Sequence, residues 1–185
     1  DLVQVAKDCE SFGADGITIH PRPDQRHIRY SDIPALKAIV STELNIEGNP
    51  TEEVMQQVLA YKPHQCTLVP DSPSALTSDQ GWDTLKESSF LTEITARLKE
   101  QGIRVSIFLD ASPRMVEGAA SIGADRVECY TGPFAAQYRT DPRAAIAGHI
   151  AAAQEASHLN VCVNAGHDLT LDNLRFYASM IPNLL

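Results

Sequence analysis

The chain repeats one unit along its length: an amphipathic helix, a glycine, a short apolar strand and a polar loop. Apolar residues recur at helical spacing over residues 2–12, Gly13 then suits a helix C-cap, and the apolar run 16–20 follows as a strand. The connection Gly-Ala-Asp occurs at 13–15 and again at 123–125, each time between a helix and a strand. This recurrence favours one repeated βα unit over two unrelated domains.

Six strands with flanking helices are predicted, at 16–20, 44–47, 65–70, 104–109, 126–130 and 160–164. Short strands that alternate with helices imply a parallel sheet, because parallel neighbours need a crossover connection. The pattern alone leaves both a barrel and an open doubly wound sheet. No G-x-G-x-x-G or P-loop follows a strand, so the nucleotide-binding signatures of open sheets are absent. Six strands also fit an eight-stranded barrel of about 250 residues whose ends are missing.

Helix starts are predicted from residues that cap well. These are Ser31, Asn49 with Pro50, Ser112 with Pro113, Asp141 with Pro142, and Thr170. The histidines that fall on helices or at their ends are interpreted as surface or capping residues. They are His64, His149 and His158.

Charge and composition exclude some partners. The formal net charge is −9, which argues against binding to nucleic acid or to an anionic membrane, because polyanion binding relies on clustered Lys and Arg. No apolar run approaches the roughly 20 residues that span a bilayer. The four cysteines form no C-x-x-C pair, so reduced thiols in a cytoplasmic protein are expected, with no zinc site.

Polar residues follow the strands where each strand ends, which is the edge that carries active sites in barrels and open parallel sheets. Six consecutive loops that present such groups are a stronger signal than any one residue. The residues are His20, Arg22, Arg26, His27, Glu47, Thr77, Ser78, Asp110, Glu128, Thr131, Gly132, Asn164, Gly166 and His167.

Two of these strand ends favour specific chemistry. Arg22, Arg26 and His27 form a good anion clamp, because Arg presents a planar fork to phosphate oxygens, although a solvated loop would have the same pattern. Glu47 ends an apolar strand, where an unpaired carboxylate would be desolvated, as suits a general base. His20 is either a functional group or a core histidine that bonds to the backbone.

The sixth strand end, Asn164-Ala165-Gly166-His167, joins a strand to a helix. Gly166 would let the backbone approach a ligand, and His167 could exchange a proton near neutral pH. A plain turn is the alternative. No lysine ends a strand, so a Schiff-base lysine is not visible, and in carbonyl–amine chemistry the amine would belong to a substrate.

Several segments, in order along nearly the whole chain, resemble the pyridoxine 5'-phosphate synthase family. The combination is specific, and no single segment is. The segments are 13–20 with Arg22, Asp24, Arg26, His27 and Ile28; 45–47; 62–64 with 68–70; Thr77 with Gly81; 123–125; Glu128 with 131–132; and 163–167.

The resemblance implies an α/β fold, the (β/α)8 TIM barrel, with residues 1–185 forming a single domain that lacks its first and last strand regions. It implies a cytoplasmic homo-octamer that acts on small phosphate substrates with no organic cofactor. The expected reaction condenses 1-deoxy-D-xylulose 5-phosphate with 3-amino-2-oxopropyl phosphate, giving pyridoxine 5'-phosphate, phosphate and water. Poor activity is expected for these residues alone, because an open barrel would expose two strand edges.

The same resemblance implies catalytic roles. His20 and Glu47 match the family's two proton acceptors, and His167 matches its proton donor. Glu128 resembles a supporting polar residue, and Asn164 and Gly166 are expected to support the same site.

It also implies substrate contacts. Arg22, His27 and Thr77 match residues that contact the deoxyxylulose phosphate. The position of Asp168 contacts the phosphate of the aminoketone, and some members of the family have Gly there. A contact from the backbone would be the same with Asp as with Gly at this position. The resemblance does not explain why a carboxylate would lie beside a phosphate.

Three other functions fit parts of the pattern. A sugar-phosphate isomerase or epimerase would use Glu47 as its base on a single substrate. A metal-dependent hydrolase would use His20, Glu47, Glu128 and His167 as ligands, but no H-x-H or H-E-x-x-H spacing supports it. A degenerate barrel that only binds a phosphometabolite is the third, and the retained acid–base residues weigh against it.

Overall fold

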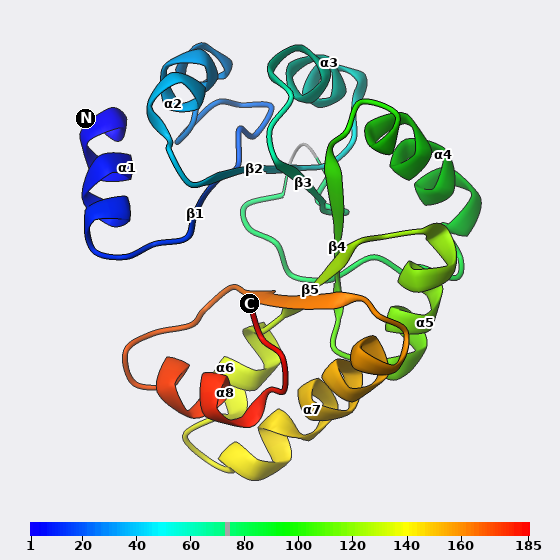
Figure 1. Ribbon diagram of the computed structural model, residues 1–185. Helices are drawn as coiled ribbons and strands as arrows, with labels where there is room; N and C mark the ends of the chain where they lie inside the picture. Colours follow the sequence, from blue (N-terminus) through cyan, green and yellow to red (C-terminus); the bar gives the residue numbers. More distant parts are fainter. Residues whose placement is uncertain (73–74) are drawn as a thin grey trace.

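The computed structural model describes residues 1–72 and 75–185, in which six parallel strands form one curled sheet in chain order. The strands are β1 (Gly16–Ile19), β2 (Glu43–Gly48), β3 (Gln65–Leu68), β4 (Arg104–Asp110), β5 (Arg126–Tyr130) and β6 (Cys162–Gly166). β1 and β6 are the outer strands of this sheet, and Leu184 adds one parallel bridge to Val163 on β6. Figure 1 looks along the axis of the curl and shows the open side between β1 and β6.

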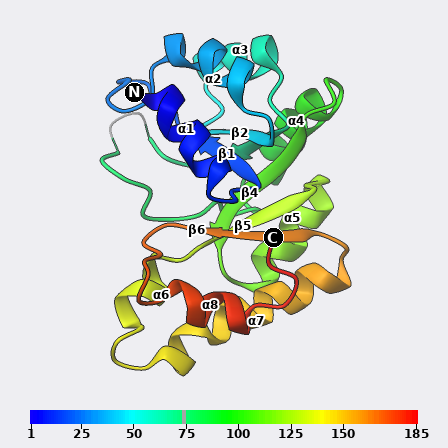
Figure 2. The ribbon, with the colours of Figure 1, turned by 60° about the vertical axis from the view of Figure 1, so that its left-hand side comes forward.

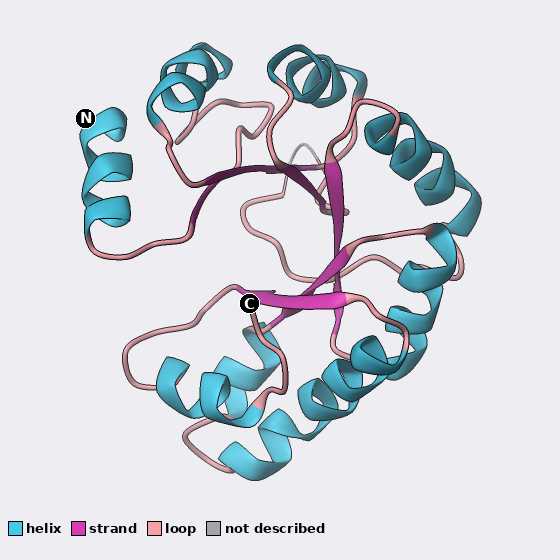
Figure 3. Cartoon of the chain, in the orientation of Figure 1, coloured by secondary structure: helices cyan, strands magenta, loops and turns pink. Residues whose placement is uncertain are grey.

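Helices lie outside the curl, as Figure 3 shows by colour. They are α1 (Leu2–Ser11), the 3-10 turn η1 (Tyr30–Asp32), α2 (Ile33–Ile39), α3 (Glu52–Tyr61), α4 (Ser88–Lys99), α5 (Pro113–Ile122), α6 (Gly132–Gln137), α7 (Pro142–His158) and α8 (Leu174–Met180). Figure 2 brings the open side forward, with α1 beside β1 and α8 near β6. The predicted parallel α/β architecture is confirmed, and its strands curl in the order of a barrel.

The two faces of the sheet differ in chemistry. Residues that point outward pack against the helices and form the apolar core, in which Leu44, Ile46 and Ile107 are fully buried. Residues that alternate with them are polar: Asn45 donates to the Thr18 and Thr67 hydroxyl oxygens, at 3.2 and 3.0 Å. The inside of the curl is therefore hydrophilic and suits a polar ligand better than an apolar one.

Two helix starts in the first half of the chain differ from the prediction. Ser31 lies inside η1, and α2 begins after Asp32. Thr51 caps α3, because its hydroxyl accepts from the Val54 N–H, and the preceding Asn49 and Pro50 stay outside the helix. Polar residues stand side by side at these loops, and the sequence does not show which of them directly precedes the helix.

The start of the last helix and one short helix were also missed. Thr170 precedes a turn, and α8 begins at Leu174. The helix α6 was not predicted, because Gly132-Pro133 suggests a loop. By contrast, α5 and α7 begin as predicted, after Ser112 and after Asp141, whose carboxylate accepts from two backbone N–H groups of the first turn.

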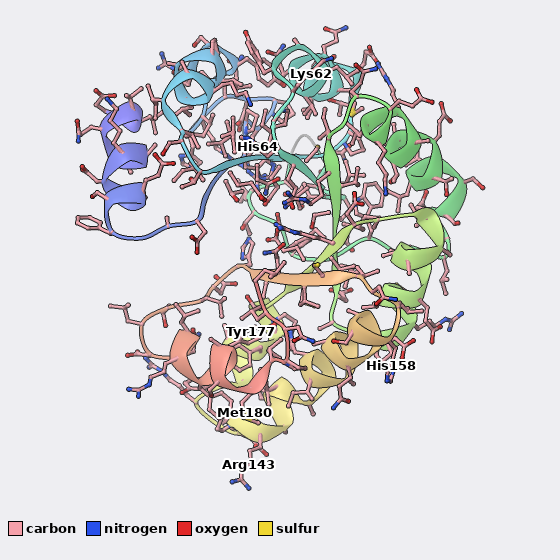
Figure 4. All side chains as sticks on the ribbon, viewed as in Figure 1. Lys62, His64, Arg143, His158, Tyr177 and Met180 are labelled. Atoms are coloured by element: carbon pink, nitrogen blue, oxygen red, sulfur yellow. The ribbon has the colours of Figure 1, made fainter. Side chains whose placement is uncertain are left out.

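The interpretation of His149 as a surface or capping residue is wrong. His149 is only 5% exposed, and its Nδ1 lies 2.9 Å from the Tyr177 hydroxyl of α8. Burial lowers the pKa of His149 to about 4, so the ring is neutral at neutral pH. His158 is exposed near the end of α7, and Figure 4 shows it at the periphery of the molecule.

His64 has a local structural contact, since its Nδ1 accepts from the Leu44 N–H at the start of β2. Among the described residues, no helix has both the length and the apolar character needed to cross a membrane.

Candidate active site

The candidate site lies at the carboxyl ends of the strands, which parallel pairing brings to one rim of the sheet. His20 directly follows β1, and Glu47 lies near the end of β2. Asp110 ends β4, and His167 follows β6. We call this edge the carboxyl rim. It collects side chains that are far apart in the sequence.

His20 and Glu47 form a pair at this rim. Ile19 is paired with Ile46 in the β1–β2 register, so the residues that follow them are neighbours. The His20 Nδ1 lies 3.2 Å from the Glu47 Oε1, and the two side chains are 21% and 15% exposed. A carboxylate next to an imidazole can orient the ring and accept its proton, and this pair is still reachable from outside.

His167 has contacts on both ring nitrogens. Its Nε2 lies 3.1 Å from the Thr77 hydroxyl oxygen, and its Nδ1 lies 3.1 Å from the Asp168 Oδ2. The edge of its ring system meets Tyr130, with centroids 5.4 Å apart. His167 and Asp168 both have positive φ, 87° and 57°. Such strained non-glycine backbone concentrates at functional sites.

Thr131 holds the backbone of this strained segment. Its side chain is fully buried, and its hydroxyl donates to the Gly166 carbonyl at 2.7 Å and also contacts the His167 carbonyl oxygen. Its N–H donates to the same Gly166 carbonyl. The end of β6 is thus fixed from the end of β5.

Two arginines after β1 hold the loop after β3. Arg22 donates to the Asp71 carboxylate and to the Ala75 carbonyl, each at 3.1 Å. Arg26 donates to the carbonyls of Ala75 and Leu76. These bonds tie down the segment that ends at Thr77, so the β1 loop, the β3 loop and the β6 loop meet at the carboxyl rim.

His27 is exposed, and the described part of the chain gives it no hydrogen bond or ion pair. The structure therefore places it on the same loop as Arg22, without bringing it to the His20–Glu47 pair. Sequence reasoning did not single out Asp71 or Tyr130. Asp71 directly follows the predicted strand 65–70, and that position was the available signal.

Glu128 on β5 has an unusual protonation state. Burial and, secondarily, the charge of Glu47 raise the pKa of Glu128 to about 8, so its carboxyl carries a proton at neutral pH. Its side chain lies against Gly166, where any Cβ would collide with the carboxyl group. A side chain at position 166 would therefore force the Glu128 carboxyl group to move. Asn164, its register partner, has a buried Oδ1 without a partner among the described residues.

A cavity of about 810 Å³ lies inside the curl. Its lining includes Glu128, Asn164 and Gly166 but neither His20 nor His167. A crevice of about 10 Å³ adjoins His20 and Arg22. The candidate residues His20 and His167 lie at the rim, whereas the cavity extends to the amino ends of the strands at Gly16, Glu43 and Gln65. Within residues 1–72 and 75–185, no group of three or more His, Cys, Asp or Glu side chains could hold a metal ion.

A curled parallel sheet with outer helices and acid–base groups on one rim of strand ends defines the class of barrel enzymes. A family model described as pyridoxal phosphate biosynthesis protein PdxJ matches residues 1–185. The chain belongs to this family, and the resemblance inferred from its motifs is confirmed.

Relatives named pyridoxine 5'-phosphate synthase are similar over the whole chain. The protein of Cytophaga hutchinsonii is 56% identical over 184 residues, which cover 100% of this chain and 77% of the relative. That of Bacteroides thetaiotaomicron is 53% identical over 182 residues, 98% of this chain and 77% of the relative. That of Flavobacterium johnsoniae is 51% identical over 185 residues, which cover 100% of this chain and 78% of the relative.

Proposed function

We propose that this protein condenses 1-deoxy-D-xylulose 5-phosphate with 3-amino-2-oxopropyl phosphate, forming pyridoxine 5'-phosphate, phosphate and water. Family membership supports the reaction class. The observation that carries the proposal is the His20–Glu47 pair, 3.2 Å apart, on the same rim as His167. Joining an amine to a ketone and closing an aromatic ring requires repeated proton transfers, which two acceptors and one donor can share.

In this proposal, Glu47 and His20 accept protons from the substrates, and His167 returns a proton to an oxygen that leaves. Glu128 holds its own proton at neutral pH, so it supports the site as a hydrogen-bond donor rather than as a second charge beside Glu47. One carboxylate and one carboxylic acid can lie close together without the repulsion that two carboxylates would have.

Arg22, His27 and Thr77 are proposed to bind the phosphate of the deoxyxylulose substrate. Two of the five N–H donors of Arg22 are used by Asp71 and Ala75, which leaves donors for phosphate oxygens. The crevice beside Arg22 is too small for a sugar phosphate, so we expect the segment 75–78 to move when this substrate binds. The backbone at Asp168 is proposed to contact the second phosphate.

The test is an assay of the complete protein with both phosphates, alongside Glu47→Gln. The amide cannot accept the proton, so we expect turnover to fall roughly 10²–10⁴-fold. Glu53→Gln, on the exposed side of α3, is the matched control and should keep full turnover. Unchanged turnover in Glu47→Gln would remove this carboxylate from the mechanism. A product without a pyridine ring would instead favour a single-substrate isomerase.

The family resemblance also leads us to propose a homo-octamer in the cytoplasm. Sedimentation of the complete protein tests the assembly, and fractionation of cells tests the location. A stable monomer in the working concentration range would contradict the first.

A further inference from the structure

Asp168 stands where a carboxylate would repel the phosphate that is proposed to bind there. Its side chain has a partner: the Asp168 Oδ2 lies 3.1 Å from the Nδ1 of His167. The Nε2 on the other side of the same ring lies 3.1 Å from the Thr77 hydroxyl. The ring is therefore held between a carboxylate and a hydroxyl.

The backbone is shaped for this contact. His167 and Asp168 both have positive φ, and the side chains of these adjacent residues lie within hydrogen-bond distance of each other. Thr131 fixes the carbonyls of Gly166 and His167 from below. The strain at two non-glycine residues is thus supported by a buried hydrogen-bonding side chain, as a functional contact would require.

The contact determines which ring nitrogen carries a proton. A carboxylate can only accept, so the Nδ1 of His167 must donate to Asp168. In the neutral ring, Nε2 then accepts from Thr77, and in the charged ring both nitrogens donate. Nε2 is the nitrogen that faces away from Asp168, so the proton that His167 delivers leaves from there.

We propose that Asp168 is a positioning residue that holds the His167 ring with Nδ1 donating to the Asp168 carboxylate, so that Nε2 delivers the proton to the leaving oxygen. The proposal rests on the proposed function of His167 as the proton donor. It also gives the carboxylate a role that does not involve the phosphate, which the backbone at the same position would contact. Because the Asp168 side chain is 58% exposed, its effect is on orientation and protonation and not on overall stability.

Three variants of the complete protein test this role. Asp168→Asn keeps the size, tolerates positive φ and retains an acceptor for Nδ1, but it loses the charge. We expect kcat to fall about tenfold, less than the roughly 10²–10⁴-fold that the acid itself supplies. Asp168→Gly removes both the acceptor and the strain, so stability should stay or rise while kcat falls further. KM for both substrates should change less than about twofold.

The third variant separates this proposal from the proposed function. If His167→Gln keeps full turnover, His167 is not the acid and the proposed function fails. If His167→Gln is inactive while Asp168→Asn and Asp168→Gly turn over like the unmodified protein, only the role of Asp168 is overturned. A lower KM for the aminoketone with unchanged kcat would also overturn it, since that would show simple relief of repulsion.

Imidazole ¹⁵N spectra provide a readout that a purely structural role would not change. At a pH where the ring is neutral, we expect the Nδ1–H tautomer of His167 in the unmodified protein and in Asp168→Asn. In Asp168→Gly this preference should be lost, and an unchanged tautomer there would overturn the proposal. The His167→Gln variant assigns the resonance. Asp172→Asn, which removes an exposed pair with Arg139 in the same loop region, is the matched control and should change neither kcat nor the spectrum.

Discussion

Both rims of the sheet have glutamate side chains, but the two rims differ in the charged partners that these glutamates have. At the amino rim, defined by the first residues of the strands, Glu43 accepts from Arg104 at 2.6 Å and from Arg126 at 3.0 Å. Gln65 accepts from the same Arg126. Among the described residues at the carboxyl rim, Glu47 has only His20 within ion-pair distance, and Glu128 has no charged partner of opposite sign.

The difference shows how one strand can serve both structure and chemistry. Glu43 and Glu47 lie four residues apart on β2, and alternation places both on the inner face. Glu43 is paired with two arginines that favour its ionised form, so it is poorly suited to exchange protons near neutral pH. Glu47 is paired with a histidine, which can itself gain or lose a proton near neutral pH. The partner, rather than the carboxylate, decides the role.

The largest effect on stability is expected at the amino rim. Burial alone would raise the pKa of Glu43, but the hydrogen bonds and charges of Arg104 and Arg126 lower it below its usual value. Glu43→Gln leaves both arginines without a counter-charge, so we expect unfolding free energy to fall by about 2–3 kcal/mol at pH 7. Urea denaturation measures this loss, while turnover per folded molecule should stay the same.

The pH dependence checks the origin of that loss. Because the folded-state pKa of Glu43 is lowered, its stabilisation is present above the ordinary carboxyl pKa and disappears as the pH falls through the lowered value. The difference between Glu43→Gln and the unmodified protein should therefore shrink in acid. Glu100→Gln, at an exposed position after α4, is the control. A large loss of turnover in Glu43→Gln would break the contrast between the rims.

The next largest effect on stability is expected at Glu128, where replacing Glu by Gln should stabilise the protein instead of destabilising it. Its folded-state pKa, about 8, lies above its usual value of 4.5, so the unfolded state releases its proton first as the pH rises. The unmodified protein should therefore lose stability from Glu128 between these values, and Glu128→Gln should not. We expect the variant to become progressively more stable than the unmodified protein as the pH rises from 5 to 8.

Denaturant midpoints measured across that pH range test the prediction, with the exposed Glu117→Gln as the control. A difference that stays flat with pH would show that Glu128 is ionised in the folded protein. In that case the two rims would differ less than proposed.

The smallest effect is expected at Thr131. Thr131→Val keeps the shape but removes the hydroxyl that donates to the Gly166 carbonyl, so we expect a loss of about 1 kcal/mol. Faster hydrogen exchange of the backbone amides over residues 166–170 would locate the change, and Thr131→Ser should restore protection. Unchanged exchange would mean that the strained segment is held by other contacts.

The fold was largely readable from the sequence. Apolar periodicity and capping residues located all six strands and seven of the helices. These features are local, because spacing and backbone freedom act within a few residues. The starts of α2, α3 and α8 were less predictable, since neighbouring polar residues compete for the same cap.

The candidate site divides in the same way. The residue types and their positions after strands were determined by the sequence, and so was the family to which they belong. Which groups meet was decided only by the tertiary structure: Arg22 with Asp71, Thr77 with His167, and Glu128 with Gly166. The same is true of the protonation of Glu128, because burial and the charge of Glu47 arise only when strands distant in sequence lie side by side.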